Sequence, residues 1–152
     1  MTTAEKEQKT ETVTLNVPSH PKYLYVIRSA LYPILIDAGF IKKEARKIIL
    51  AVDEACSNII KYAYEGAHTG TIGVEVRVSE DALLIQLIDT GRKPDVARIA
   101  PRKLDEVRPG GLGTHFMSAV FDTIEYDTKR EQGTLLTMKK KRQAMMRSEV
   151  GQ

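Results

Sequence analysis

Glu54 and Asn58 lie four positions apart near the end of a long segment with a regular apolar pattern, KIILAVDEACSNIIKYAYEG. In a helix four residues make just over one turn, so the carboxylate and the amide point the same way. A carboxylate can orient or deprotonate a hydroxyl group, and an amide oxygen is a hard ligand that suits magnesium. The same spacing also occurs by chance on many solvated helix faces, so the pair gains its meaning from the motifs that follow.

A second polar motif, Asp89-Thr90-Gly91, ends a predicted apolar strand. A carboxylate in that place can accept hydrogen bonds from an exocyclic amine such as that of adenine, and the glycine lets a flat ring approach the backbone. Aspartate and glycine are also ordinary turn residues, so a plain strand-ending turn is the alternative. Alone, the motif favours the plain turn.

Gly110, Gly111 and Gly113 precede a predicted short helix in GGLGTHFM. Unhindered amides at the start of a helix make a natural phosphate site, and a hinge for a flexible lid is the alternative. The stretch matches neither the P-loop nor the dinucleotide fingerprint, because no lysine follows the glycines and they come after a long loop. That loop, residues 90–112, carries a net charge of +3, which could hold a triphosphate or an acidic partner, or serve only as solubilising surface.

The pair Glu54 and Asn58 is positioned by the clearest predicted helix, from about Lys42 to Tyr64. Apolar residues recur there every three or four positions. When they are projected at 100° per residue, the stripe centres near Val52 and the pair falls about 120–160° from that centre. This position alone favours a solvated helix face. The apolar stripe consists of Ala45, Ile48, Ile49, Val52, Ala55, Cys56, Ile59, Ile60 and Ala63.

The remaining pattern predicts strands grouped in hairpins around the helices. An earlier helix has Pro21 near its first turn and ends at Gly39. Segments 72–78 and 82–88 form a hairpin whose second strand is more central, because it is almost continuously apolar. Together the elements predict an α+β fold, a two-layer sandwich of a mixed, mostly antiparallel sheet with helices on one face. The other predicted elements are strands at 13–17, 124–128 and 133–140 and a short helix at 113–121.

The composition is that of a soluble globular protein. With 152 residues, of which 42% are hydrophobic and 28% charged, the chain is expected to form one domain with an ordinary core. No apolar run approaches the length of a membrane span, and the polar start lacks a signal-peptide core. Cys56 is the only cysteine, so no intrachain disulfide forms and a cytoplasmic location is the default expectation.

The net charge of +3 is unevenly distributed. Residues 139–152 carry five basic residues and one acidic residue, a net +4, which leaves −1 for the rest. The body therefore lacks the basic character of a nucleic-acid-binding face. The run Lys139–Arg142 is predicted to be the frayed end of an edge strand, where lysine discourages aggregation, with docking of an acidic partner as the alternative. His20, His68 and His115 are isolated in the sequence and lack metal-ligand spacing, so solvated or locally bonded histidines are expected.

Four motifs occur in order along the chain, namely Glu54…Asn58, Asp89-x-Gly91, GGLGTHFM and Gly133-Thr134. Together they resemble the ATP-binding fold shared by gyrase, Hsp90, histidine kinases and MutL. Within it the chain most resembles the bacterial anti-sigma-factor serine/threonine kinases, because it is compact and lacks a helical domain with a phosphoacceptor histidine. The resemblance covers roughly residues 12–140. It implies the histidine-kinase-like ATPase fold, in which the helix with the first motif lies over the sheet and faces a nucleotide cleft.

The resemblance assigns a role to each matching residue. Asn58 would coordinate the Mg²⁺ that bridges the phosphates of ATP, and Glu54 would be the general base for the attacking hydroxyl of a protein serine or threonine. Asp89 would bind the adenine amine with Gly91 beside it, and Thr134 would support the adenine pocket. The phosphates would be bound by the backbone amides of Gly111, Leu112, Gly113 and Thr114. The Thr114 hydroxyl would bind them as well.

One part of the family pattern is missing. The second glycine of D-x-G-x-G is absent, because the chain continues as Arg92-Lys93-Pro94-Asp95. A short variant with a proline and an aspartate is frequent among the anti-sigma-factor kinases, whereas histidine kinases more often keep the glycine. Because Arg92 and Lys93 are bulky, the sequence does not determine the shape of the edge of the adenine site.

The resemblance implies an ATP-dependent protein serine/threonine kinase that is also an anti-sigma factor. It would use ATP, release ADP, require Mg²⁺, phosphorylate an anti-sigma-factor antagonist, sequester a sigma factor and form a homodimer. Direct binding to nucleic acid or to a membrane is not expected. Two alternatives stay open, a non-catalytic nucleotide-binding partner-switching module and a detached ATPase domain of a sensor histidine kinase. The predicted divisions are a disordered lead at 1–11, the kinase domain at 12–141 and a flexible basic tail at 142–152.

Overall fold

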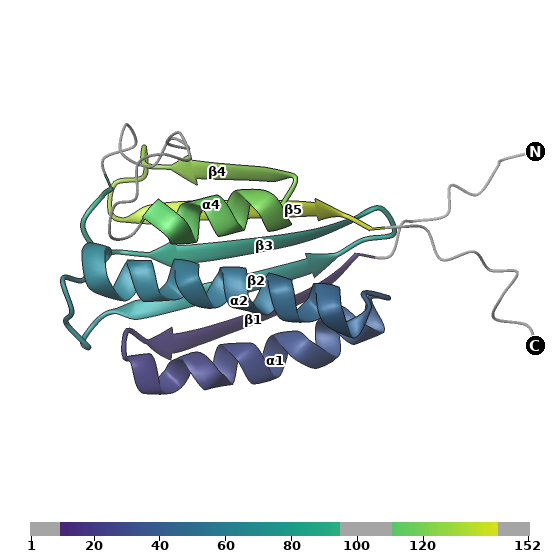
Figure 1. The fold of residues 1–152 in the computed structure, drawn as a ribbon. Coiled ribbons are helices and arrows are strands. Elements are labelled where there is room, and N and C mark those ends of the chain that lie inside the picture. The colour runs from purple at the N-terminus through teal and green to yellow at the C-terminus, as the bar shows by residue number, and fades with distance from the viewer. Residues whose placement is uncertain (1–9, 95–110, 143–152) are drawn as a thin grey trace, which may run out of the picture.

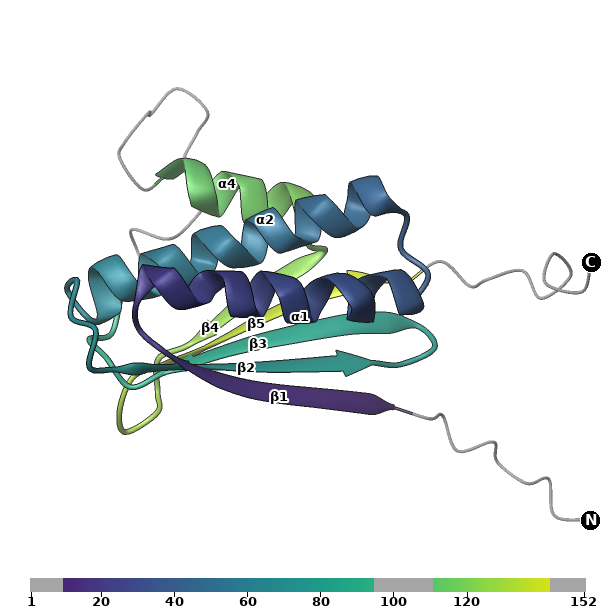
Figure 2. The same cartoon turned by 90° about the horizontal axis from the view of Figure 1, so that it is seen from below.

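The computed structural model describes residues 10–94 and 111–142, with the side chains of the second range described from residue 116 onward. Five strands form one sheet in the order β1-β2-β3-β5-β4. Helices α1, α2 and α4 cover one face of this sheet, so the molecule has two layers (Figure 1, Figure 2). The main elements are β1 (Glu11–Pro18), α1 (Leu24–Asp37), α2 (Lys42–Asn58), β2 (Thr71–Val78), β3 (Ala82–Asp89), α4 (Gly111–Val120), β4 (Thr123–Asp127) and β5 (Thr134–Lys141).

This architecture confirms the predicted α+β sandwich with its helices on one face. Every strand pair in the described part of the chain is antiparallel, so the sheet there is not mixed. A tight turn joins β2 to β3 and a longer loop, residues 128–133, joins β4 to β5; an antiparallel pair needs only such a local connection. β3 lies in the middle of the sheet, as its almost continuous apolar sequence predicted.

The core lies between the sheet and the helices and follows the two periodicities of strand and helix. The buried positions of α2 include Val52 and Cys56, which confirms the predicted apolar face of this helix. Burial raises the pKa of the Cys56 thiol, so the thiol is a small packed group and not a nucleophile. The fully buried side chains of the two central strands are Ile72, Val74, Val76, Leu83, Ile85 and Leu87.

Both ends of the first helix carry the predicted signals. Pro21 opens a 3₁₀ turn before α1, and His20 caps this turn because its Nδ1 accepts a hydrogen bond from the Lys22 N–H at 3.1 Å. At the other end Gly39 has a φ of 95°, and its N–H bonds to a carbonyl three residues earlier at 3.0 Å. A left-handed residue closes a helix, and glycine adopts that conformation without strain.

The second helix has the predicted extent but not the predicted winding. After Asn58 it continues as a π-turn, Ile59–Ala63 (η2). The N–H of Tyr64 bonds to the carbonyl of Ile59, five residues earlier, at 3.1 Å. Such turns insert one extra residue into a helix and are frequent at functional sites. The extra residue here follows directly after Asn58, the second residue of the pair Glu54 and Asn58.

The prediction that the basic run ends an edge strand is wrong. β5 pairs with β3 on one side and with β4 on the other, so it is an interior strand. Lys140 Nζ donates to the carbonyl of Val120 at 2.9 Å and thereby bonds the C-terminal end of α4. The Arg142 guanidinium donates to the Ala38 carbonyl at 2.6 and 3.0 Å and also to the Ser79 carbonyl. These basic side chains therefore join elements that are distant in sequence.

α4 begins at Gly111, so Gly111 and Gly113 lie in its first turn and not before it. Gly110 and most of the predicted lid fall outside the described residues, which stop at 94 and resume at 111. The same holds for residues 1–9 of the predicted lead and for the predicted tail beyond Arg142. Those predictions stay as stated.

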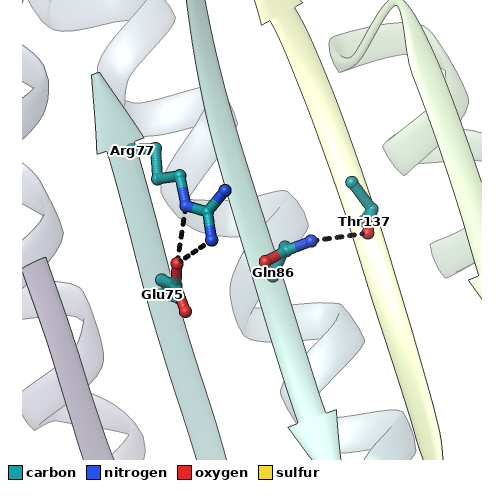
Figure 3. Close-up of polar contacts among 4 residues, drawn as sticks. All are labelled: Glu75, Arg77, Gln86 and Thr137. Atoms are coloured by element: carbon teal, nitrogen blue, oxygen red, sulfur yellow. Dashed lines mark hydrogen bonds and ion pairs between the residues drawn. The ribbon is translucent and has the colours of Figure 1, made fainter. Parts of the chain in front are cut away.

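The sheet face opposite the helices carries paired polar side chains. Figure 3 shows Arg77 beside Glu75 on β2, with a hydrogen bond of 2.6 Å, and Gln86 donating to Thr137 at 3.2 Å between β3 and β5. The helices lie behind the sheet in this view. The alternation of the strands thus sends the buried apolar residues toward the helices and leaves polar side chains, together with Ile88 and Leu135, on the open face.

Candidate functional site

The carboxyl group of Asp89 is the main polar group enclosed at the end of β3, where the residue is only 4% exposed. Its Oδ1 accepts a hydrogen bond from the Gly91 N–H at 3.0 Å. Burial raises the pKa of this carboxyl, while backbone hydrogen bonds from Gly91 and Thr134 and the charge of Arg130 act in the opposite direction. A carboxylate offers about four lone-pair sites, so it can still accept a donor from a ligand.

Two glycines make this corner possible. Gly133 has a φ of 70°, and a Cβ there would lie 1.8 Å from the carbonyl oxygen of Asp89. A Cβ on Gly91 would lie 2.4 Å from the carbonyl oxygen of Ala63. Gly91 therefore lets the backbone after β3 approach the end of the second helix. This is a second reason for a glycine at this position, besides the approach of a flat ligand ring that the sequence predicted. The β4–β5 turn, the end of β3 and η2 meet here.

Two buried side-chain atoms near Asp89 have no hydrogen-bond partner, and they are the only such atoms in the described part of the chain, namely Thr134 Oγ1 and Arg130 Nη1. Thr134 is paired with Asp89 across β3 and β5, and the charge of Arg130 acts on the Asp89 carboxyl. An unmade hydrogen bond on a buried group costs roughly 1–3 kcal/mol, so such atoms need a physical reason. The edge of a purine ring, with donors and acceptors side by side, fits a carboxylate flanked by a hydroxyl and a guanidinium.

Arg92 and Lys93, the latter in the place of the family's second glycine, are held by contacts with neighbouring segments. The Arg92 N–H donates to the Ala63 carbonyl at 2.7 Å, and its guanidinium lies 3.2 Å from Glu65. Lys93 Nζ donates to the carbonyl of Arg130. Arg92 and Lys93, whose effect on the shape of the adenine site the sequence did not decide, are thus bonded to η2 and to the β4–β5 turn.

Glu54 and Asn58 lie on the half-buried flank of α2. Neither side chain has a hydrogen-bond or ion-pair partner among the described side chains, which are those of residues 10–94 and 116–142. The carboxylate of the neighbouring Asp53 differs, because it forms an ion pair of 2.5 Å with Arg28 of α1. Of the two adjacent acids, therefore, only Glu54 is available to a ligand.

The described residues contain no group of three His, Cys, Asp or Glu side chains that could hold a metal ion by themselves. Mg²⁺ does not require such a cage, since it usually keeps waters and binds one or two protein ligands together with substrate phosphates. The single amide oxygen of Asn58, next to a half-buried carboxylate, fits that mode. His20 is locally bonded, as expected, because its Nδ1 accepts from the Lys22 N–H, and its ring lies 3.9 Å from that of His68.

The predicted phosphate-binding residues form the first turn of α4. The N–H groups of a helix's first turn have no partner within the helix, and the helix dipole favours an anion beside them. In both overall views α4 runs beside α2 over the same face of the sheet (Figure 1, Figure 2). The predicted role of the Thr114 hydroxyl lies outside the described side chains. The four residues are Gly111, Leu112, Gly113 and Thr114.

The structure brings Asp89, Gly91 and Thr134 into one corner, as the resemblance implied. It connects that corner to Asn58 through η2, because Ala63 at the end of this turn contacts the Gly91 backbone. Sequence reasoning missed two residues of the corner, Tyr64 and Arg130. A tyrosine directly after a helix gives no signal of its own, and Arg130 reads as an ordinary turn residue.

Comparison with known proteins gives a consistent picture. Residues 17–140 match the family described as histidine kinase-like ATPase domain. Serine-protein kinase RsbW of Listeria innocua is 31% identical over 121 residues, which cover 74% of this chain and 77% of that protein. Serine-protein kinase RsbW of Bacillus pumilus is 29% identical over 123 residues, which cover 74% of this chain and 76% of that protein.

A solved structure shares the fold. The crystal structure of the RsbU and RsbW domains of Rv1364c from Mycobacterium tuberculosis matches with a TM-score of 0.61 and 16% sequence identity. The match covers 88% of this chain and 33% of that chain, so this chain spans about a third of the longer protein. Within residues 10–94 and 111–142, no helix has the length and apolar character needed to cross a bilayer.

Proposed function

This chain belongs to the histidine kinase-like ATPase domain family, within its serine-protein kinase branch, and from that premise we propose the reaction that its residues perform. It is an ATP-dependent protein serine/threonine kinase and an anti-sigma factor. Its protein substrate is an anti-sigma-factor antagonist, and it sequesters a sigma factor when that antagonist is phosphorylated. The observation that carries the proposal is the enclosed Asp89 carboxyl with the unpaired Thr134 hydroxyl beside it.

The adenine end of the nucleotide binds at the corner formed by β3 and β5. Asp89 accepts a hydrogen bond from the exocyclic amine of adenine, and Thr134 supplies a hydroxyl to the same ring, directly or through water. Support comes from their burial, since both residues are 4% exposed and the Thr134 Oγ1 has no protein partner. Hydrogen bonds made in such an enclosed place discriminate strongly between ligands, because a wrong ligand leaves the buried groups unpaired.

The phosphates extend from this corner toward α4 and α2. Backbone N–H groups of Gly111–Thr114 bind them at the start of α4, where a helix favours an anion. Asn58 is the protein ligand for Mg²⁺, which, when bound, neutralises phosphate charge and fixes the phosphates for in-line attack. The basic residues between 92 and 108 add positive charge from the segment before α4.

Glu54 acts as the general base. Phosphoryl transfer depends mainly on positioning and charge neutralisation, so little covalent help from the protein is needed. The substrate hydroxyl oxygen forms a bond to the γ-phosphorus as the bond to ADP breaks, and the hydroxyl proton passes to the Glu54 carboxylate. Support comes from its half-buried, unpaired state, whereas Asp53 is held by Arg28.

The kinase domain is residues 12–141, with a lead before it and a basic tail after it. The protein works in the cytoplasm without direct contact to nucleic acid or membrane. It forms a homodimer, for which the sheet face without helices is the available surface, with Ile88 and Leu135 adjacent on it.

Calorimetry with Mg-ATP tests the first step of the reaction. The wild-type chain is expected to bind Mg-ATP, and Asn58→Ala is expected to lose the part of the binding that depends on Mg²⁺. Ser57→Ala, one position away on the same helix, is the matched control and should bind as the wild type does. Wild-type protein that does not bind ATP would refute the proposed function.

Transfer of labelled phosphate tests the second step. Incubation with labelled ATP, Mg²⁺ and the antagonist protein is expected to label a serine or threonine of the antagonist. ATP binding without any transfer, combined with stable binding of the partner, would instead favour a non-catalytic partner-switching module. Label on a histidine would favour the ATPase domain of a sensor kinase.

A further inference from the structure

The hydroxyl group of Tyr64 joins three segments at the edge of the adenine corner. It accepts a hydrogen bond from the Thr90 N–H at 2.9 Å and donates one to the Thr71 carbonyl at 2.7 Å. It also lies 3.4 Å from the Thr90 hydroxyl. Thr90 stands between Asp89 and Gly91, so this single phenol bonds the middle residue of the motif proposed to bind adenine, Asp89-Thr90-Gly91.

The backbone of this motif is fastened at three consecutive N–H groups. The N–H of Thr90 goes to the Tyr64 hydroxyl, that of Gly91 to the Asp89 carboxylate, and that of Arg92 to the Ala63 carbonyl. Two of these three acceptors belong to the end of the second helix. The position of the Asp89 carboxylate is therefore tied to that helix end by neighbouring bonds.

The π-turn after Asn58 gives Tyr64 its position. The Tyr64 N–H bonds to the Ile59 carbonyl in the five-residue pattern of this turn. In a continued α-helix each residue advances by about 100°, so the extra residue of the π-turn changes the direction in which Tyr64 leaves the helix. The winding change thus sets the phenol against β2 and the end of β3.

The ring of Tyr64 packs against a glycine. A Cβ on Gly70 would lie 2.3 Å from Cε1 of the Tyr64 ring, so the ring packs directly on this backbone. Gly70 is itself fixed, because its N–H donates to Ser19 Oγ at 3.0 Å and its carbonyl accepts from the Ser19 N–H at 2.9 Å. The phenol is consequently held between a fixed turn and the base-reading motif.

We infer that Tyr64 is a positioning residue for nucleotide binding, which aligns the Asp89-Thr90-Gly91 motif with the helix that carries Glu54 and Asn58. The inference rests on the proposed function, since it assigns to this contact the task of setting the adenine site relative to the phosphate site. Tyr64 acts through Thr90 and touches no reacting atom. Its loss should therefore weaken nucleotide binding and leave the transfer step itself nearly unchanged.

Tyr64→Phe removes only the hydroxyl, and Tyr62→Phe is the matched control two residues away. Tyr62 is 57% exposed and its hydroxyl has no hydrogen-bond partner in the described part of the chain. Tyr64→Phe is expected to raise the Kd and the KM for Mg-ATP about 3–10-fold, the loss expected for one net hydrogen bond, with kcat within about twofold. Tyr62→Phe should leave all three unchanged.

Gly70→Ala provides a second route to the same defect. It keeps the phenol but displaces the ring, so it should also raise the KM for ATP. In an Asp89→Asn background, Tyr64→Phe should add little further loss of ATP affinity, because both changes act on the same motif.

A Tyr64→Phe protein that melts at a lower temperature but keeps the wild-type KM would overturn the inference and leave a purely structural tyrosine. Full additivity with Asp89→Asn would overturn it as well. Failure of wild-type protein to bind ATP is a separate outcome, which removes the proposed function and the inference with it.

Discussion

The corner at the end of β3 and the flank of α2 are built in opposite ways, although we propose that both contribute to one site. In the corner, Asp89 and Thr134 are each 4% exposed, and backbone N–H groups bond to the Asp89 carboxylate. On the flank, Glu54 and Asn58 are half-buried and have no partner in the described part of the chain. The fold itself holds the corner, whereas the proposed ligand would fix the two side chains on the flank.

This difference separates binding from chemistry. A corner fixed by backbone contacts is preorganised, so its proposed binding of a base costs little conformational entropy. Side chains without protein partners take their working geometry from the phosphates, the metal and the incoming hydroxyl, and apo geometry often tightens only in the complex. Changes in the corner should therefore appear in ATP affinity, and changes on the flank should appear in kcat.

Glu54→Gln should give the largest effect. Loss of the general base is expected to lower kcat by about 10²–10⁴-fold while the Kd for ATP stays within about twofold, because glutamine keeps the size and polarity of the side chain. Steady-state phosphate transfer to the antagonist protein measures the first quantity, and calorimetry measures the second.

Asp53→Asn is the matched control for the Glu54 change, since it removes the adjacent carboxylate. It breaks the exposed ion pair with Arg28, which is worth about 0.2–1 kcal/mol at such a site, and should leave kcat intact. If Glu54→Gln transfers phosphate at the wild-type rate, or if Asp53→Asn loses transfer instead, the base has been assigned to the wrong residue.

Asp89→Asn should come next. It replaces a charged acceptor by an amide whose NH₂ group faces the adenine amine or a backbone N–H, so ATP affinity should fall about 10–100-fold, the range expected for a charged hydrogen bond. Asp81→Asn, at the exposed opposite end of β3, is the control and should bind ATP normally. A normal Kd in Asp89→Asn would place the adenine amine elsewhere.

The same variant gives a test by pH. The native pKa of Asp89 lies above its ordinary value of 3.8, chiefly because the carboxyl is buried. Between these two values the folded chain keeps a proton that the unfolded chain has released, so the free energy of unfolding falls as the pH rises through this window. Urea unfolding across the window should show this slope in the wild type and a weaker one in Asp89→Asn. A steeper fall in the variant would contradict the assignment.

The contrast also explains what could be predicted from the sequence. The stripe around Val52 and the alternation in β2 and β3 are local periodic signals, so helix extents, hairpins and the two-layer sandwich followed from them. The interior position of β5, the winding change after Asn58 and the bond from Tyr64 to Thr90 depend on partners many residues away. No local pattern encodes such pairings, so they became visible only in the folded chain.

The site residues likewise divide into those that a local motif could suggest and those that depend on distant partners. Resemblance to a family could suggest Asp89 and Thr134, because their motifs are short and ordered along the chain. It could not show that Gly91 is required by the Ala63 carbonyl, or that Arg130 places a buried, unpaired nitrogen near the same carboxyl. Those features arise from the convergence of η2, β3 and the β4–β5 turn.

Thr134→Val should give the smallest effect and the most specific one, because stability and affinity should move in opposite directions. Valine has nearly the same shape and suits a strand, and it removes a buried hydroxyl that has no protein partner. The apo protein should therefore gain about 1 kcal/mol in free energy of unfolding, while ATP affinity falls roughly 5-fold because the ring loses a polar contact. Thr137→Val, on the open face of the same strand, is the control, where ATP affinity should not change. If Thr134→Val lost stability and kept its ATP affinity, the hydroxyl would have a structural partner in the protein and would make no contact with the nucleotide.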